Sequence, residues 1–258
     1  MSALLTGDPG LAVRFLIGAG LGAIIGSFLA TIVSRWPRGA SVVTGRSRCD
    51  GCGRALGLLD LVPLVGWLVA RGKCRTCGAR IDPVHPGIEV GAALIGGYCA
   101  LAFPPLPALL FAVGGWLLLT LAVLDARHMW LPDALTLPLA ALGLTLGDWI
   151  LPAPFMDRVI GAAAGAGLLL LLALGYKRLR GREGLGLGDA KLLGAIGAWL
   201  GWQALPFVLL IASITALLWV LALRLRGEAI DAQMRVPLGT FLCLAVVPGW
   251  MIALALSI

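Results

Sequence analysis

Residues 187–226 read LGDAKLLGAIGAWLGWQALPFVLLIASITALLWVLALRLR, and this stretch decides the class of fold. Its apolar part, 191–223, is too long for one membrane-spanning helix, which needs about 20 residues. The segment from Gly201 to Pro206 interrupts the run with residues that end helices. We therefore predict two spans joined by a turn, with Asp189 just before the first of them.

Similar apolar runs recur through the chain, in which 60% of the residues are apolar and only 13% are charged. Together they predict about eight transmembrane helices, so we expect an all-α polytopic membrane protein. The first run lacks a basic segment before it and a small-residue cleavage site after it, which predicts a retained span and not a signal peptide. Besides 191–223, the apolar runs are 11–33 (the first run), 88–124 (divided at Pro104 and Pro105), 134–150, 158–175 and 237–257.

The placement of basic residues agrees with eight spans. If the spans alternate in direction, 17 of the 20 Lys and Arg residues fall on one side of the membrane. Because basic loops remain in the cytoplasm, that side is predicted to be cytoplasmic and both termini are predicted to lie outside. The connections on the basic side are 34–87, 125–132, 176–190 and 224–236.

The connection 34–87 is long enough to form a separate small domain. We therefore expect three parts: a first transmembrane helix in 1–33, a cytoplasmic domain in 34–87, and a membrane domain of about seven helices in 88–258. An apolar stretch inside the connection, 58–70, is short and is interrupted by Pro63 and an aspartate. This stretch is predicted to lie at the membrane interface or inside the small domain, and not to span.

Two C-x-x-C pairs lie in this connection, separated by 21 residues. The spacing is typical of zinc ribbons. A site with four thiolates is closed, so the zinc would be structural and would stabilise a domain too small for a core of its own. Two pairs without metal, or a redox-active pair, are the alternatives, whereas structural disulfides are disfavoured in the cytoplasm. The predicted ligands are Cys49, Cys52, Cys74 and Cys77.

Basic residues surround the four cysteines. A basic zinc ribbon can bind nucleic acid, but this one is tethered to a bilayer at both ends. Attraction to anionic lipid headgroups is therefore the simpler interpretation. We expect membrane lipids, and no nucleic acid, as partners of this domain.

Two aspartates occupy corresponding ends of predicted spans. Asp125 lies at the cytoplasmic end of the third span and Asp189 at the cytoplasmic start of the sixth, so both should lie at the same depth. Two carboxyl groups brought together share a proton, and one can act as base on a water while the other polarises a carbonyl. The glycines of 184–188 would let a peptide approach closely. The pair is therefore a candidate for acid–base catalysis.

Simpler roles are open for the same aspartates. Asp189 precedes an apolar helix and could cap its N-terminus, and Asp133 looks still more like such a cap. Asp125 could form an ion pair with Arg127 or His128. The alternative at the level of function is a non-catalytic transporter or scaffold with a zinc-binding cytoplasmic loop. A transporter should carry polar residues at mid-membrane, which these spans nearly lack.

Several motifs resemble those of the bacterial type IV prepilin peptidases, which are membrane aspartic proteases of the GxGD type. LGLGDAKLL (185–193) contains the G-x-G-D signature, and DARHMWLPD (125–133) resembles the segment around the first catalytic aspartate. RSRCDGCGRALGLLDLVPLVGWL (46–68) resembles the cytoplasmic domain of the family, GSFLATIVSRWP (26–37) its opening motif and HPGIE (85–89) its closing motif. The resemblance thus extends over most of the chain.

The resemblance implies what the protein does and where. It implies removal of the leader peptide, after a glycine, from type IV prepilins or from the pseudopilins of type II secretion, at the cytoplasmic face of the bacterial inner membrane. Asp125 and Asp189 would be the catalytic aspartates. For many members it also implies methylation of the new N-terminal residue, usually phenylalanine, with S-adenosylmethionine as the methyl donor.

Two positions depart from the family's pattern in the region associated with methyl transfer. Ala30 replaces an asparagine in the opening motif, and His85 replaces a tyrosine in the closing motif. Glu89 keeps the family's acid at a membrane boundary and is a weak candidate for binding the cofactor, with a charge at a helix start as the alternative. No glycine-rich dinucleotide loop follows a strand here, so the sequence does not locate an S-adenosylmethionine site.

Overall fold

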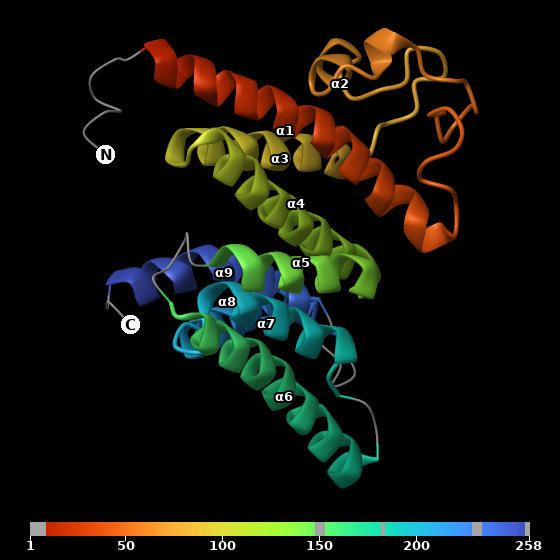
Figure 1. Cartoon of the computed structure of the whole chain (residues 1–258). Coiled ribbons are helices and arrows are strands. Elements are labelled where there is room, and N and C mark those ends of the chain that lie inside the picture. The colour runs from red at the N-terminus through yellow and green to blue at the C-terminus, as the bar shows by residue number, and fades with distance from the viewer. Residues whose placement is uncertain (1–8, 148–152, 182–183, 229–233, 256–258) are drawn as a thin grey trace. The chain divides into compact units, whose positions relative to one another are not determined.

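The computed structural model describes residues 9–147, 153–181, 184–228 and 234–255. Helices are the only regular elements in these ranges, which confirms the expected all-α class. The chain divides into two compact units, Met1–Thr120 and Leu121–Ile258. Helix α4 (Pro105–His128) crosses this division, so its last turns belong to the second unit (Figure 1).

Helices α1 (Pro9–Arg35) and α3 (Val84–Ala102) pack against each other in the first unit (Figure 1). Glycines spaced by four residues along α1 bring the two backbones into contact, as is usual between membrane helices. At Gly22 an added Cβ would meet the carbonyl oxygen of Ala92, and Gly26 is enclosed in the same way. This interface therefore has no room for larger side chains at these positions.

Between α1 and α3 the chain forms the cysteine segment, residues 36–83, which contains only short elements (Figure 1). Two antiparallel bridges, Arg48 with Ala55 and Lys73 with Arg80, close a turn around each C-x-x-C pair. The short helices of the segment are η2 (Trp36–Arg38), η3 (Leu58–Asp60) and α2 (Val65–Val69).

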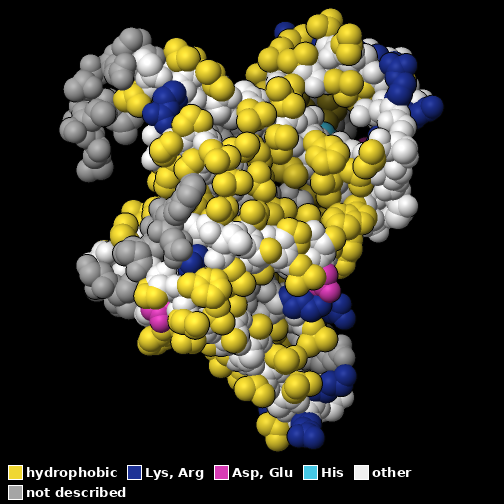
Figure 2. All heavy atoms as spheres, viewed as in Figure 1, with side chains coloured by type: hydrophobic (Ala, Val, Ile, Leu, Met, Phe, Trp, Pro, Cys, Tyr) yellow, Lys and Arg dark blue, Asp and Glu magenta, His cyan; other side chains and the backbone are white. Residues whose placement is uncertain are grey.

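The apolar stretch within this segment is exposed and is not the core of a small domain. Its large side chains form a patch over η3 and α2, and Figure 2 shows hydrophobic side chains gathered there. Exposed basic residues, Arg71, Lys73 and Arg75, follow the patch in the sequence. The interfacial location stays a prediction. The apolar patch consists of Leu58, Leu59, Leu61, Val62, Val65, Leu68 and Val69.

The second unit is built around one short helix, α7 (Leu187–Leu200), in which every residue from Leu192 onward is buried. Its neighbours are α5 (Asp133–Leu146), α6 (Phe155–Arg180), α8 (Leu205–Leu225) and α9 (Leu238–Ala255), all of which contact it (Figure 1). Close packing again depends on glycine. A Cβ on Gly161 of α6 would lie 2.6 Å from the carbonyl oxygen of Gly197 in α7.

Six of the described helices are long and apolar enough to cross a membrane: α1, α3, α4, α6, α8 and α9. The expected count of about eight spans is therefore too high by this criterion. Helices α5 and α7 occupy the positions of the other two predicted spans, but each has only 14 residues. At 1.5 Å per residue they are about 21 Å long, against a hydrocarbon core of about 30 Å. The end of the predicted run 134–150 lies outside the described residues.

The short helices still reverse the direction of the chain. Lys191 at the start of α7 binds Asp133 at the start of α5, with its Nζ 2.7 Å from Oδ1. At the opposite end, Arg158 near the start of α6 donates to the carbonyl oxygen of Gly143 near the end of α5, over 3.0 Å. Helices α5, α6 and α7 therefore alternate in direction, as the predicted topology requires.

Candidate active site

Asp125 lies in the last turn of α4, where the local sequence ends the helix. The amide of Met129 donates to the carbonyl oxygen of Asp125 over 2.9 Å, and Met129 takes a left-handed φ of +50°. Pro132 follows shortly and disfavours helical backbone in the residue before it. Asp125 is therefore fixed at the point where the helix stops.

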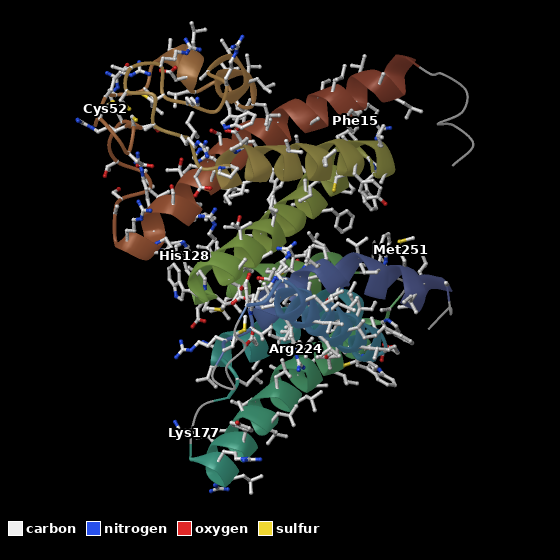
Figure 3. The ribbon with its side chains drawn as sticks, turned by 180° about the vertical axis from the view of Figure 1, so that it is seen from behind. Phe15, Cys52, His128, Lys177, Arg224 and Met251 are labelled. Atoms are coloured by element: carbon white, nitrogen blue, oxygen red, sulfur yellow. The ribbon has the colours of Figure 1, made fainter. Side chains whose placement is uncertain are left out.

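The Asp125 carboxylate is held by the first turn of α9, and the residue is 5% exposed. Its Oδ2 accepts a hydrogen bond from the amide of Thr240 at 2.8 Å and faces the Thr240 hydroxyl at 3.2 Å. A Cβ on Gly239 would lie 3.0 Å from the same oxygen, so glycine allows this approach. The carboxylate is thus bound by a distant helix, while its neighbour His128 lies at the end of α4 (Figure 3).

Asp189 lies in the first turn of α7 but is not its N-cap residue. The N-cap position is Gly186, whose backbone amide faces the Asp189 carboxyl group. Asp189 is 9% exposed, and its Oδ1 is buried without a hydrogen-bond partner in the described part of the chain. The N-cap interpretation is therefore wrong for Asp189. It is also wrong for Asp133, because the N-cap of α5 is Pro132.

The structure brings Asp125 and Asp189 together. The two carboxyl groups interact electrostatically, and both lie against the backbone amide of Gly239. Leu131, from the link between α4 and α5, fills the adjacent space, where a Cβ on Gly188 would lie 2.9 Å from Leu131 Cβ. A glycine before Asp189 thus makes room for the protein's own leucine, whereas the sequence suggested room for a peptide.

A buried pair of carboxyl groups can hold one proton between them, because two neighbouring negative charges out of water are unfavourable. One group is then a base and the other an acid, which is what activation of a water against a peptide carbonyl requires. Lys191 is close to Asp189 in sequence, but its Nζ binds both oxygens of the exposed Asp133, at 2.7 and 2.8 Å. Its charge is therefore compensated outside the pair.

The four cysteines converge on one point. Their Sγ atoms all lie within 4.8 Å of one another, and Cys49 Sγ is 3.8 Å from Cys77 Sγ; Cys52 is labelled in Figure 3. Four sulfurs that surround a zinc ion tetrahedrally at 2.3 Å are about 3.8 Å apart, so the set fits such an ion. The backbone amides of Cys77 and Thr76 lower the pKa of Cys74, and the thiolate is the form of cysteine that binds metals.

Two matching turns present these thiols. In each pair the glycine after the second cysteine has a positive φ, +70° at Gly53 and +71° at Gly78, and its amide donates to the carbonyl of the first cysteine. Asp60 joins the turns, because it binds Arg54 beside the first pair at 2.9 Å and Arg75 inside the second at 3.4 Å. Main-chain and ionic contacts therefore hold the sulfur atoms together.

Glu89 is buried in α3 and makes a contact within the chain that the sequence did not predict. Its Oε2 accepts a hydrogen bond from the amide of Leu64 at 2.8 Å, and the residue is 5% exposed. Leu64 has a φ of +61°, which is strained for a residue with a large side chain. The carboxylate thus ties α3 to the turn before α2. The two departures from the motifs, Ala30 and His85, lie in α1 and α3.

Three residues around the carboxyl groups of Asp125 and Asp189 (the acid pair) were not predicted from the sequence: Leu131, Gly239 and Thr240. The last two follow Pro237 at the start of the final apolar run, on the same predicted side as both aspartates. A glycine and a hydroxyl residue at that point are the signal that could have found them. The signal is weak, because the same residues are common at helix starts for other reasons.

Comparison with known proteins finds two family models that match the chain. Residues 21–103 match the Bacterial Peptidase A24 N-terminal domain, and residues 112–221 match the Type IV leader peptidase family. The four cysteines lie in the first match, and Asp125 and Asp189 lie in the second. Thr240 lies beyond both.

Curated relatives carry the name prepilin leader peptidase/N-methyltransferase. One from Aeromonas salmonicida is 40% identical over 217 residues, which cover 81% of this chain and 71% of that protein. One from Pseudomonas putida is 35% identical over 261 residues, covering 91% of this chain and 88% of the relative. One from Burkholderia pseudomallei is 36% identical over 259 residues, covering 90% and 83%. No solved structure matches the chain.

Proposed function

The chain belongs to the type IV leader peptidase family, and on this premise we propose that it is a membrane aspartic endopeptidase that removes the leader from prepilins or type II secretion pseudopilins. The observation that carries the proposal is the buried pair of Asp125 and Asp189 around the amide of Gly239. Methylation of the new N-terminus is the proposed second activity, because the relatives carry both activities in their name.

We propose that the acid pair acts at the cytoplasmic face of the bacterial inner membrane. Asp125 lies in the last turn of α4 and Asp189 in the first turn of α7. The connections next to these helix ends belong to the basic set, which favours the cytoplasmic side. The apolar segment of a substrate would remain in the bilayer beside the spans. Its leader would then extend toward the acid pair from the cytoplasm.

Each step of the hydrolysis transfers two protons. A water attacks the scissile carbonyl carbon while the carboxylate takes a proton from it, and the protonated partner gives its proton to the carbonyl oxygen. The C–N bond then breaks as the first group protonates the nitrogen, and the second group recovers a proton from one of the two hydroxyls. The products are a carboxylic acid and an amine, and the pair again holds one proton.

Zinc and S-adenosylmethionine have different support as cofactors. Cys49, Cys52, Cys74 and Cys77 fit a tetrahedral zinc ion, which would act as a structural ion and hold the two turns of the cysteine segment together. Glu89 is buried and its Oε2 accepts a hydrogen bond from the amide of Leu64, so one of its oxygens already has a partner within the chain, and its part in binding S-adenosylmethionine stays a prediction. No residue of this chain is assigned to the methyl donor.

Membrane lipid is the proposed partner of the apolar patch. The patch lies outside the helices that could span a membrane, on a segment whose two ends continue into α1 and α3. Apolar side chains beside exposed Arg71, Lys73 and Arg75 are the combination that binds a surface of anionic headgroups.

The proposed function is tested by mass spectrometry of a prepilin-like substrate co-expressed with the wild type, Asp125→Asn or Asp189→Asn. Asp133→Asn is the matched control, because this aspartate is exposed and its ion pair with Lys191 should contribute little. We expect a product without leader and with one added methyl group in the wild type and the control, and uncleaved substrate in the other two.

The other outcomes separate the parts of the proposal. Cleavage without the methyl group would remove the second activity and leave the peptidase. Cleavage by Asp125→Asn or Asp189→Asn would refute the acid pair. A wild type that cleaves no prepilin or pseudopilin would favour the non-catalytic transporter or scaffold.

A further inference from the structure

Thr240 connects the Asp125 carboxylate with the main chain of α4. Its amide nitrogen lies 2.8 Å from Asp125 Oδ2, and its Oγ1 lies 3.2 Å from the same oxygen. The same Oγ1 lies 2.9 Å from the carbonyl oxygen of Ala122, one turn before the aspartate. A single part-buried residue in the first turn of α9 thus fixes the position of one member of the acid pair.

The two carboxyl groups are hydrogen-bonded unequally. Asp189 meets the backbone amides of Gly186 and Gly239, and Asp125 meets those of Gly239 and Thr240. Among the described residues only Asp125 also faces a side-chain hydroxyl, that of Thr240, whereas Oδ1 of Asp189 is buried without a partner. Hydrogen-bond donors stabilise a carboxylate, and a buried oxygen without donors is unfavourable on a charged group. The negative charge is therefore better accommodated on Asp125 and the shared proton on Asp189.

We infer that Thr240 is a positioning residue that keeps Asp125 as the base of the pair, with Asp189 as the acid. The inference rests on the proposed peptidase function, and it concerns a residue that lies outside both matched family regions. With Oδ2 of Asp125 held by Thr240, Oδ1 is left to take the proton of the attacking water.

The Thr240 hydroxyl has one hydrogen and two acceptors within reach. While Asp125 is a carboxylate, this hydrogen points to Oδ2. When Asp125 has taken the proton of the water, the hydroxyl turns its hydrogen to the carbonyl oxygen of Ala122. Rotation about one side-chain bond thus follows the charge of Asp125 through the cycle, and the amide of Thr240 donates in both states.

The other ionisable groups around Asp125 do not supply such a donor. Cys243, one turn further along α9, faces both Asp125 and Asp189, but a thiol is only a weak donor. Lys191 of α7 is bound to Asp133 of α5. The hydroxyl of Thr240 is therefore the side-chain group to remove in a test.

The test compares two substitutions with a matched control. Thr240→Val replaces the hydroxyl by a methyl group and keeps the amide, and Thr240→Ser keeps the hydroxyl. Thr215→Val is the control, because Thr215 is part-buried in the same unit and its hydroxyl bonds to carbonyl oxygens of its own helix. Full-length variants in liposomes are assayed for cleavage of one purified prepilin, and kcat/KM is recorded between about pH 5 and 9.

Thr240→Val is expected to move the acidic limb of the kcat/KM profile to higher pH by about one unit, the effect of one hydrogen bond to a charged group. The sign follows because the carboxylate form of the pair loses a donor, so the base is available only at higher pH. The acidic limb of the profile reports the titration of the two coupled carboxyl groups together, and not that of Asp125 alone. On its acidic side, kcat/KM should fall about tenfold. Thr240→Ser and Thr215→Val should keep the wild-type limb.

An acidic limb of Thr240→Val that stays at the wild-type pH would overturn the inference. A shift of about one pH unit in Thr240→Ser would overturn it as well. If Thr240→Val does not fold, judged by its thermal unfolding in detergent, the Thr240→Ser profile decides alone. A wild type and a Thr215→Val control that both fail to cleave would instead overturn the proposed peptidase function.

Discussion

Replacing Gly239 by alanine adds one methyl group where Asp125, Asp189 and Leu131 meet. The added Cβ would lie 2.8 Å from Leu131 Cδ1, 3.0 Å from Asp125 Oδ2 and 3.1 Å from Asp125 Cγ. Carbon atoms in contact are normally at least about 3.5 Å apart. The leucine would therefore have to retreat by about 0.7 Å and the carboxyl group by about 0.4 Å.

We expect this change to reduce activity more than stability. A displacement of about 1 Å can reduce a rate about 100-fold, so a carboxyl group moved by a few tenths of an ångström should lower kcat about tenfold. The free energy of unfolding should fall by at most about 2 kcal/mol, because overpacking costs about 1–3 kcal/mol and alanine is about 1 kcal/mol more favourable than glycine in a helix.

The measurement is leader cleavage by purified protein, with thermal unfolding recorded on the same samples. Gly167→Ala is the control, because Gly167 also lies in a helix of this unit and its added Cβ would meet nothing within 4 Å. The control should keep the wild-type kcat and gain slightly in stability. If Gly239→Ala keeps the kcat of the wild type, the arrangement of both carboxyl groups around this residue would be refuted.

The remaining predictions concern the first unit. Elemental analysis of purified protein should find about one zinc per chain, and Cys77→Ser should lose it; a wild type free of zinc would contradict the four-thiolate site. Glu89→Ala should lower the free energy of unfolding by about 1–3 kcal/mol, because the Leu64 amide loses its acceptor. Glu89→Gln keeps an acceptor and should restore most of that loss in thermal unfolding, and equal losses in both variants would argue against this hydrogen bond. A photoreactive amino acid in place of Leu68 should crosslink to lipid in liposomes, whereas one in place of the exposed Thr76 should not; equal crosslinking would argue against docking of the patch.

The positions of the helices could be predicted from apolar runs, because hydropathy marks which segments leave water. The end of α7 could be predicted too, because Gly201, which has a φ of +78°, follows its last residue Leu200. The end of α5 could not, because its apolar run continues to residue 150 whereas the helix ends at Leu146. The cysteine cluster follows from the spacing of its two pairs, because each pair closes its own local turn.

The meeting of Asp125 with Asp189 could be anticipated, because alternation of spans decides which helix ends lie on one side. The contacts of Asp125 could not be anticipated from spacing, since Thr240 lies 115 positions away and its hydroxyl reaches the carboxylate only through the packing of α9 against the end of α4. The bond from Leu64 to Glu89 is of the same kind. Such side-chain contacts depend on the tertiary arrangement and leave no periodic signal.

The shortness of α5 and α7 also governs how a bilayer meets the second unit. Two adjacent helices of 14 residues are about 9 Å shorter than the hydrocarbon layer. Hydrophobic mismatch of this size is relieved by local thinning of the bilayer. Both helices begin at the end that carries Asp133, Asp189 and Lys191. We therefore expect the headgroups and water of a bilayer to reach closer to the acid pair, so that the peptide bond of a substrate would meet water at a level that lipid chains occupy elsewhere.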